Sequence, residues 1–103
     1  MFELYPTKDG WRISTGDGNR NQTSRIFNYL MSGKSLNRYQ SVYIDGGIKL
    51  ASRVSEINDA LTESIGIEVN SVRVDTRFRG FYFVYNLTSE QRDQIKQSYE
   101  VTA

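Results

Sequence analysis

The residue types in this 103-residue chain restrict the chemistry it can perform. The chain contains no His and no Cys, which removes the commonest general base and metal ligand, thiolate chemistry, Cys-based zinc sites and disulfides. Its remaining aspartates, including Asp9, Asp17, Asp45 and Asp75, show no spacing typical of metal ligands or of a catalytic pair. We therefore expect no metal site, no cofactor and no enzymatic activity.

The groups best suited to function are cations, and their distribution along the chain is uneven. The formal net charge is only +1. Residues 20–53, however, hold six cations and one carboxylate, residues 54–72 hold four carboxylates and no cation, and residues 73–79 hold three arginines and one aspartate. If folding brings the two basic stretches together, they form one positive face of the kind that binds nucleic acid.

Eight residues in or beside these basic stretches are the candidate DNA contacts. They are Lys34, Arg38, Lys49, Ser52, Arg53, Arg73, Arg77 and Arg79. An arginine at position 53 can donate two hydrogen bonds to the edge of guanine, or it can pair with Glu56 on the same helix face. Lys34 and Arg38 lie around the start of a predicted helix, where backbone amides and positive charge favour phosphate.

Helical periodicity and caps predict four helices, at about residues 22–32, 37–44, 48–61 and 88–99. The first has apolar residues at i, i+1, i+4 and i+5 and ends at Gly33, and the second opens on a capping box from Asn37 to Gln40. The third follows a glycine turn and has one apolar stripe, formed by Leu50, Val54, Ile57 and Leu61. That stripe leaves Lys49, Ser52, Arg53 and Glu56 on the side predicted to face solvent.

Strand patterns occur at both ends of this helical region. Residues 1–19 alternate around a proline and an Asp-Gly turn, which predicts a strand or a hairpin. Residues 67–85 predict a second hairpin with a bulge near Asn70-Ser71 and an arginine-rich tip. Both faces of its last strand are apolar, so both need cover. If the N-terminal hairpin covers one of these faces within its own chain, we expect a monomer. If it covers the face of a second copy, we expect a homodimer.

Three helices followed by a hairpin is the element order of a winged helix-turn-helix domain. We therefore predict an α+β fold with this domain at residues 20–87, an N-terminal strand or hairpin with its connector at 1–19, and a short C-terminal helix at 88–103. The stretches Tyr29–Leu36 and Lys49–Ile57, with Gly46 between them, resemble the small winged helix-turn-helix proteins of bacteriophages and prophages. This resemblance implies DNA binding and a regulatory role, although Lys49 stands where the family usually has Arg.

Two functions are compatible with these features. The first is a phage-type transcriptional regulator that reads the major groove of double-stranded DNA with the third helix and holds the backbone with the hairpin. The alternative is a winged-helix module that binds a host protein, for example a phage inhibitor of a nuclease or polymerase, and the small net charge favours it. No apolar run approaches the roughly 18 residues of a membrane span, and the first residues lack the pattern of a signal peptide. The expected location is therefore the cytoplasm of a bacterial host, with no membrane partner.

Overall fold

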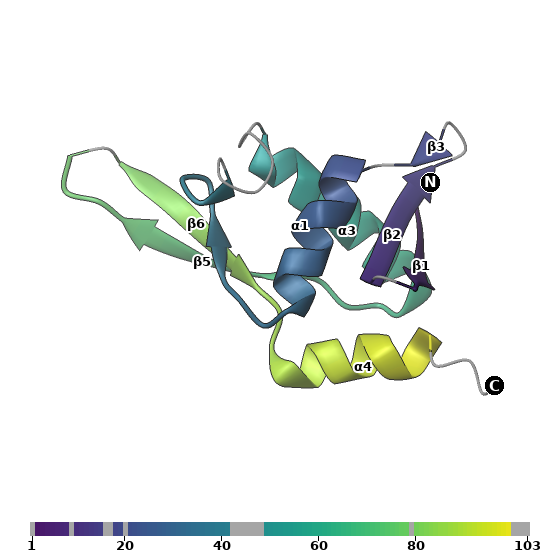
Figure 1. The fold of residues 1–103 in the computed structure, drawn as a ribbon. Coiled ribbons are helices and arrows are strands. Elements are labelled where there is room, and N and C mark those ends of the chain that lie inside the picture. Colours follow the sequence, from purple (N-terminus) through teal and green to yellow (C-terminus); the bar gives the residue numbers. More distant parts are fainter. Residues whose placement is uncertain are drawn as a thin grey trace.

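The computed structural model shows an α+β fold, and its described residues form three helices and two antiparallel three-stranded sheets (Figure 1). The structure describes residues 2–8, 10–15, 18–19, 21–41, 49–78 and 80–99. One sheet lies beside the crossed helices α1 and α3, and the other projects away from them as a long hairpin. The predicted α+β class is thus confirmed, while the order of strands and helices differs from the prediction.

The N-terminal sheet has one strand more than the predicted hairpin. Its strands are β1 (Glu3–Thr7), β2 (Gly10–Thr15) and β3 (Gly18–Asn19), in the order β1-β2-β3. Leu4 and Ile13 are direct partners in the β1–β2 ladder and both are buried. The alternation of apolar and polar residues therefore turns one face of this sheet toward the helices.

The first and third predicted helices are confirmed as the centre of the core. Helix α1 (Asn21–Met31) and helix α3 (Leu50–Ser64) cross each other (Figure 1). Their buried apolar residues are Ala60 of α3 and those of the two predicted stripes: Ile26, Phe27, Leu30 and Met31 from α1, and Leu50, Val54, Ile57 and Leu61 from α3. The helical period thus predicted which faces are covered.

Side chains of α1 complete the hydrogen bonding of β2. The Trp11 N–H donates to Asn28 Oδ1 (2.8 Å), and Asn28 Nδ2 donates back to the Trp11 carbonyl (2.9 Å). The Ile13 N–H donates to Ser24 Oγ (2.8 Å). Strand β3 pairs only with the last residues of β2. The Asn28 and Ser24 side chains therefore make the hydrogen bonds to the β2 backbone that a longer partner strand would otherwise make.

The second sheet has the order β4-β6-β5, formed by β4 (Leu36–Asn37), β6 (Phe81–Asn86) and β5 (Asn70–Asp75). Strand β4 lies where the second helix was predicted to begin, because buried Leu36 pairs with Tyr85 of β6. The predicted capping contacts still form, since Asn37 Oδ1 accepts from the Gln40 N–H (2.9 Å) and Gln40 Oε1 accepts from the Asn37 N–H (3.1 Å). The rest of that predicted helix and the predicted glycine turn fall on residues 42–48, which lie outside the described residues.

The hairpin is regular, and the predicted bulge is wrong. Its ladder runs in step from Asn70 opposite Asn86 to Asp75 opposite Phe81. The break in alternation has another cause: Val69 lies in the chain before β5, buried, with its N–H bonded to Asn58 Oδ1 (2.8 Å). The N-terminal sheet packs on α1 and α3, so the alternative in which it covers a face of the last strand within the chain is wrong, and cover in trans stays a prediction.

The C-terminal helix α4 (Ser89–Tyr99) begins as predicted. Thr88 and Gln91 form a reciprocal capping box, with the Gln91 N–H bonded to Thr88 Oγ1 (3.1 Å) and the Thr88 N–H bonded to Gln91 Oε1 (2.9 Å). Ile95 is fully buried, and the Tyr99 ring meets the Trp11 ring edge to face at 5.4 Å. None of the helices in the described part of the chain is long and apolar enough to cross a membrane.

Candidate nucleic-acid interface

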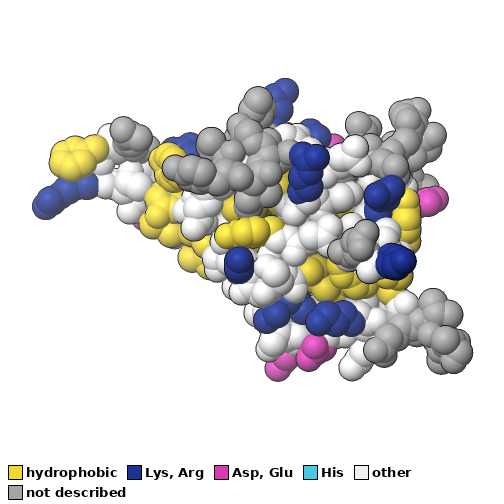
Figure 2. All heavy atoms as spheres, viewed as in Figure 1, with side chains coloured by type: hydrophobic (Ala, Val, Ile, Leu, Met, Phe, Trp, Pro, Cys, Tyr) yellow, Lys and Arg dark blue, Asp and Glu magenta, His cyan; other side chains and the backbone are white. Residues whose placement is uncertain are grey.

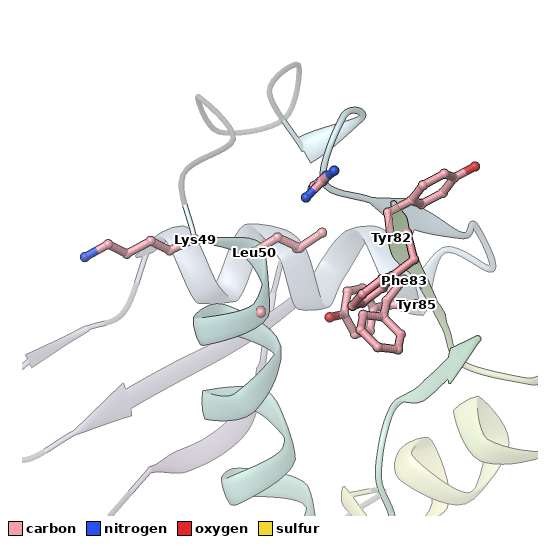
Figure 3. Close-up of a pocket in the computed structure, with 8 residues that line it drawn as sticks. Lys49, Leu50, Tyr82, Phe83 and Tyr85 are labelled. Atoms are coloured by element: carbon pink, nitrogen blue, oxygen red, sulfur yellow. The ribbon is translucent and has the colours of Figure 1, made fainter. Parts of the chain in front are cut away.

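The start of α3 and the hairpin share one groove of about 400 Å³. Its lining residues are Arg38, Lys49, Leu50, Ala51, Phe81, Tyr82, Phe83 and Tyr85. Figure 3 shows Leu50 directed toward the aromatic side chains of the hairpin, while the Lys49 ammonium points the other way, out from the helix. The groove therefore has an aromatic wall and the cationic side chain of Arg38, with Lys49 at its edge, and no carboxylate among its described lining residues.

The aromatic wall is a row along one face of β6. The ring centroids of Phe81 and Phe83 are 5.6 Å apart, and those of Phe83 and Tyr85 are 6.4 Å apart. Burial raises the pKa of the Tyr85 phenol, so this end of the row stays uncharged at neutral pH. Tyr82 points to the opposite face, where it packs on Tyr39 at 5.5 Å.

The first half of α3 offers a surface of small and basic residues. Lys49, Ala51, Ser52 and Ser55 are all exposed, and the first turn contains no acidic residue. The predicted exposure of Lys49 and Ser52 is thus confirmed. Small side chains let a ligand approach the helix backbone closely.

The acidic residues lie at the other end of α3. Asp59 and Glu63, from its last turns, line a separate depression with Phe2 and Glu68. The positive and negative stretches seen in the sequence are therefore separated along the axis of this helix. An anionic partner is attracted to its first half and repelled from its second.

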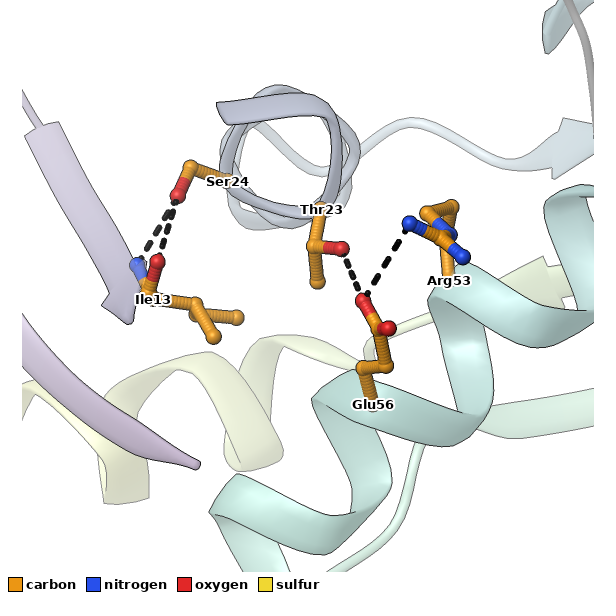
Figure 4. A network of polar contacts seen from close by, with 5 residues as sticks. All are labelled: Ile13, Thr23, Ser24, Arg53 and Glu56. Atoms are coloured by element: carbon orange, nitrogen blue, oxygen red, sulfur yellow. Dashed lines mark hydrogen bonds and ion pairs between the residues drawn. The ribbon is translucent and has the colours of Figure 1, made fainter. Parts of the chain in front are cut away.

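The prediction that Arg53 and Glu56 face solvent is wrong. Glu56 Oε1 accepts a hydrogen bond from Thr23 Oγ1 of α1 and lies 3.6 Å from Arg53 Nη1 (Figure 4). The Arg53 side chain keeps only 22% of its exposure, and the Glu56 side chain keeps only 17%. Glu56 therefore links the two core helices and holds Arg53 beside it, which is the ion pair considered as the alternative to a guanine contact.

Lys34 and Arg38 occupy different places. Lys34 is exposed, with its Nζ 5.4 Å from the centroid of the Tyr29 ring, and it does not line the groove. Arg38 lines the groove, packs over the Tyr39 ring at 5.0 Å and donates from Nη2 to the Tyr39 hydroxyl (2.9 Å). The structure thus brings Arg38, but not Lys34, together with Lys49.

The hairpin arginines also differ from one another. Arg73 Nε lies 3.0 Å from Asp75 Oδ1, and its guanidinium packs over the Phe81 ring at 4.0 Å. Arg77 is exposed near the tip, beside Phe78, which is 89% exposed. Figure 2 shows basic and apolar atoms together at the end of the hairpin. Arg79 lies outside the described residues.

One basic region was missed from the sequence. Lys8, Arg12 and Arg25 line a depression of about 310 Å³ between the N-terminal sheet and α1. Strand alternation was the available signal, because it places Arg12 on the face opposite buried Ile13. The nearness of Arg25 depends on how α1 packs against β2, which the strand pattern does not give.

The described residues hold no cluster of three or more Asp or Glu placed to bind a metal ion. The described lining of the groove offers a ligand cationic, hydroxyl and aromatic contacts. Comparisons with protein-family models, curated proteins and solved structures found no match for this chain.

Proposed function

We propose that this protein binds double-stranded DNA as a winged helix-turn-helix protein. In this proposal the first half of α3 enters the major groove and the β5–β6 hairpin is the wing that lies along the backbone. The observation that carries it is the shared groove, where Lys49 and Arg38 accompany the start of α3 and the hairpin without a described carboxylate. The acidic end of α3 then points away from the DNA.

The succession of α1, α3, β5 and β6 supports the same proposal. After α1 the described chain runs through β4, α3, β5 and β6, and β4 joins the hairpin by pairing with β6. This pairing anchors the base of the hairpin to the helices, while its tip projects well beyond α3 (Figure 1). A projecting antiparallel hairpin beside an exposed helix can reach phosphates next to the groove that the helix occupies.

The residues divide into base-edge and backbone contacts. Lys49 and Ser52 lie on the exposed start of α3, where a docked helix meets base edges. Arg38 and Arg77 suit phosphates, because one lies at the groove and the other near the hairpin tip. Arg53 contributes only if it leaves Glu56. The two phosphate contacts, from Arg38 and Arg77, give a salt slope of about −2 in log K against log salt.

A pair of charge reversals tests the proposal. Lys49→Glu places a carboxylate at the start of α3, and Lys96→Glu makes the same change on exposed α4. In a fluorescence-anisotropy titration with random-sequence duplex at low salt, we expect Lys49→Glu to weaken binding about tenfold or more and Lys96→Glu to change it less than about twofold. Equal effects, or no binding by the unmodified protein, contradict the proposal.

A second candidate function is binding to a host protein, as a phage inhibitor of a nuclease or polymerase would do. Six large apolar side chains of the described residues are exposed, and five of them lie on or against the hairpin: Tyr39, Val72, Phe78, Phe81 and Phe83. Exposed aromatic clusters of this kind are typical of protein-binding surfaces. Absence of DNA binding, with capture of one host protein that Phe78→Ser abolishes, favours this alternative. The DNA-binding proposal also includes a regulatory role in the cytoplasm of a bacterial host.

A further inference from the structure

Strand β5 is an open edge of its sheet. In the order β4-β6-β5 it has a neighbour on one side only, and no described strand pairs with its outer side (Figure 1). Ser71, Val72, Arg73 and Asp75 are exposed, and Val72 keeps 60% of its surface. Unpaired backbone N–H and C=O groups along such an edge are a template for another strand.

The residues of this edge are complementary to themselves. Arg73 and Asp75 lie two positions apart, on one face of the strand and on either side of Val74. A two-fold axis through Val74 sets two copies of β5 antiparallel, with Arg73 opposite the partner's Asp75 at two equivalent places. Val74 then meets the partner's Val74 on the other face.

Neighbouring registers lack this match. An axis through Arg73 sets Arg73 opposite the partner's Arg73, which is repulsive. An axis through Val72 sets Arg73 opposite the partner's Ser71 and leaves Asp75 with no charge opposite it. The charges therefore select the register centred on Val74, because it alone among these three opposes unlike charges.

The two charged side chains are available for this pairing. Arg73 and Asp75 keep 58% and 76% of their side-chain exposure while their own contact spans 3.0 Å. In the paired edges the four groups alternate in sign around the axis, so the contact within each chain is kept and two contacts between chains are added.

We propose that a second copy of this chain docks on β5, so that the two three-stranded sheets become one six-stranded sheet across a two-fold axis. The proposal does not depend on DNA binding. Strand pairing over so few residues buries less than the roughly 1,200–2,000 Å² of a stable interface. We therefore expect a reversible dimer whose population rises with protein concentration.

Charge exchange tests the register directly. Arg73→Asp opposes two carboxylates at each contact, and Asp75→Arg opposes two guanidinium groups. Each variant alone is expected to dimerise about tenfold more weakly, or worse, because both attractive pairs become repulsive. An equimolar mixture restores two unlike pairs, and so does the double variant R73D/D75R, so both should dimerise like the unmodified chain.

Sedimentation velocity of the DNA-free proteins, from about 1 µM to about 1 mM, measures the dimer fraction, and native mass spectrometry identifies the mixed dimer. The proposal is overturned if the unmodified chain stays monomeric, if either single variant dimerises undiminished, or if neither the mixture nor the double variant recovers. A simple loss of folding does not imitate the expected result, because mixing two misfolded chains cannot restore a pair that lies between chains.

Discussion

Removing the Asn28 carboxamide is the sharpest test of how the N-terminal sheet is held on α1. The Asn28 side chain makes three hydrogen bonds, two with the Trp11 backbone at 2.8 and 2.9 Å and one to the Ser24 carbonyl at 2.9 Å. Each contributes about 1 kcal/mol net, and Asn28→Ala also leaves the Trp11 N–H without its partner. We expect the free energy of unfolding to fall by about 2–3 kcal/mol, a large part of the 5–15 kcal/mol typical of a domain.

Urea denaturation followed by Trp fluorescence measures this loss. Trp11 is the only Trp in the chain, and its ring packs against Phe27 at 5.9 Å. Gln97→Ala, at an exposed position of α4, is the control and should change stability by less than about 0.5 kcal/mol. Asn28→Asp keeps an acceptor for the Trp11 N–H but sets a carboxylate oxygen against the Trp11 and Ser24 carbonyls, so it should destabilise at least as much as Asn28→Ala. A loss below about 0.5 kcal/mol for Asn28→Ala refutes the assigned role.

Three further changes probe other contacts. Gly33 has φ +90°, and a Cβ there would lie 2.8 Å from the Arg92 guanidinium of α4, whereas Gly66 has φ +81° and nothing within 4 Å. Gly66→Ala should lower the free energy of unfolding by about 1 kcal/mol in urea titrations, and Gly33→Ala should lower it more. Glu56→Gln should lower the free energy of unfolding by about 1 kcal/mol. It should also tighten DNA binding in anisotropy titrations, because it releases Arg53 and removes a negative charge from α3, and unchanged or weaker binding counts against this role of Glu56. Burial raises the pKa of the Tyr85 phenol above 10.0, so the stability that the neutral phenol contributes is complete below pH 10.0 and is lost as the pH rises through the raised pKa. In alkaline buffer the free energy of unfolding should therefore decline less for Tyr85→Phe than for the unmodified protein, and an identical decline contradicts this.

Helices α1, α3 and α4 could be predicted from the sequence, whereas the short strand β4, which lies where another helix was predicted to begin, could not. The stripe from Leu50 to Leu61 has the helical period over three turns, and its residues are buried as expected. Strand β4 has two residues, Leu36 and Asn37, too few for any period to appear. It exists because Leu36 pairs with Tyr85, far along the chain.

The candidate interface shows the same division between local and distant causes. Exposure of Lys49 and Ser52 follows from the helix face opposite the stripe. The withdrawal of Arg53 does not, because Glu56 is fixed by Thr23, which lies 33 residues away on another helix. Patterns within one element predicted its faces, while contacts between elements decided which cations remain free.

Chemical-shift mapping by NMR tests the central claim most directly. In a titration of the ¹⁵N-labelled protein with duplex DNA at low salt, we expect the largest amide shifts at residues 49–55 and at the hairpin residues 73–78. The acidic end of α3, around Asp59 and Glu63, should shift little. Shifts centred on that acidic end, or no shifts at all, contradict DNA binding by the start of α3 and the hairpin.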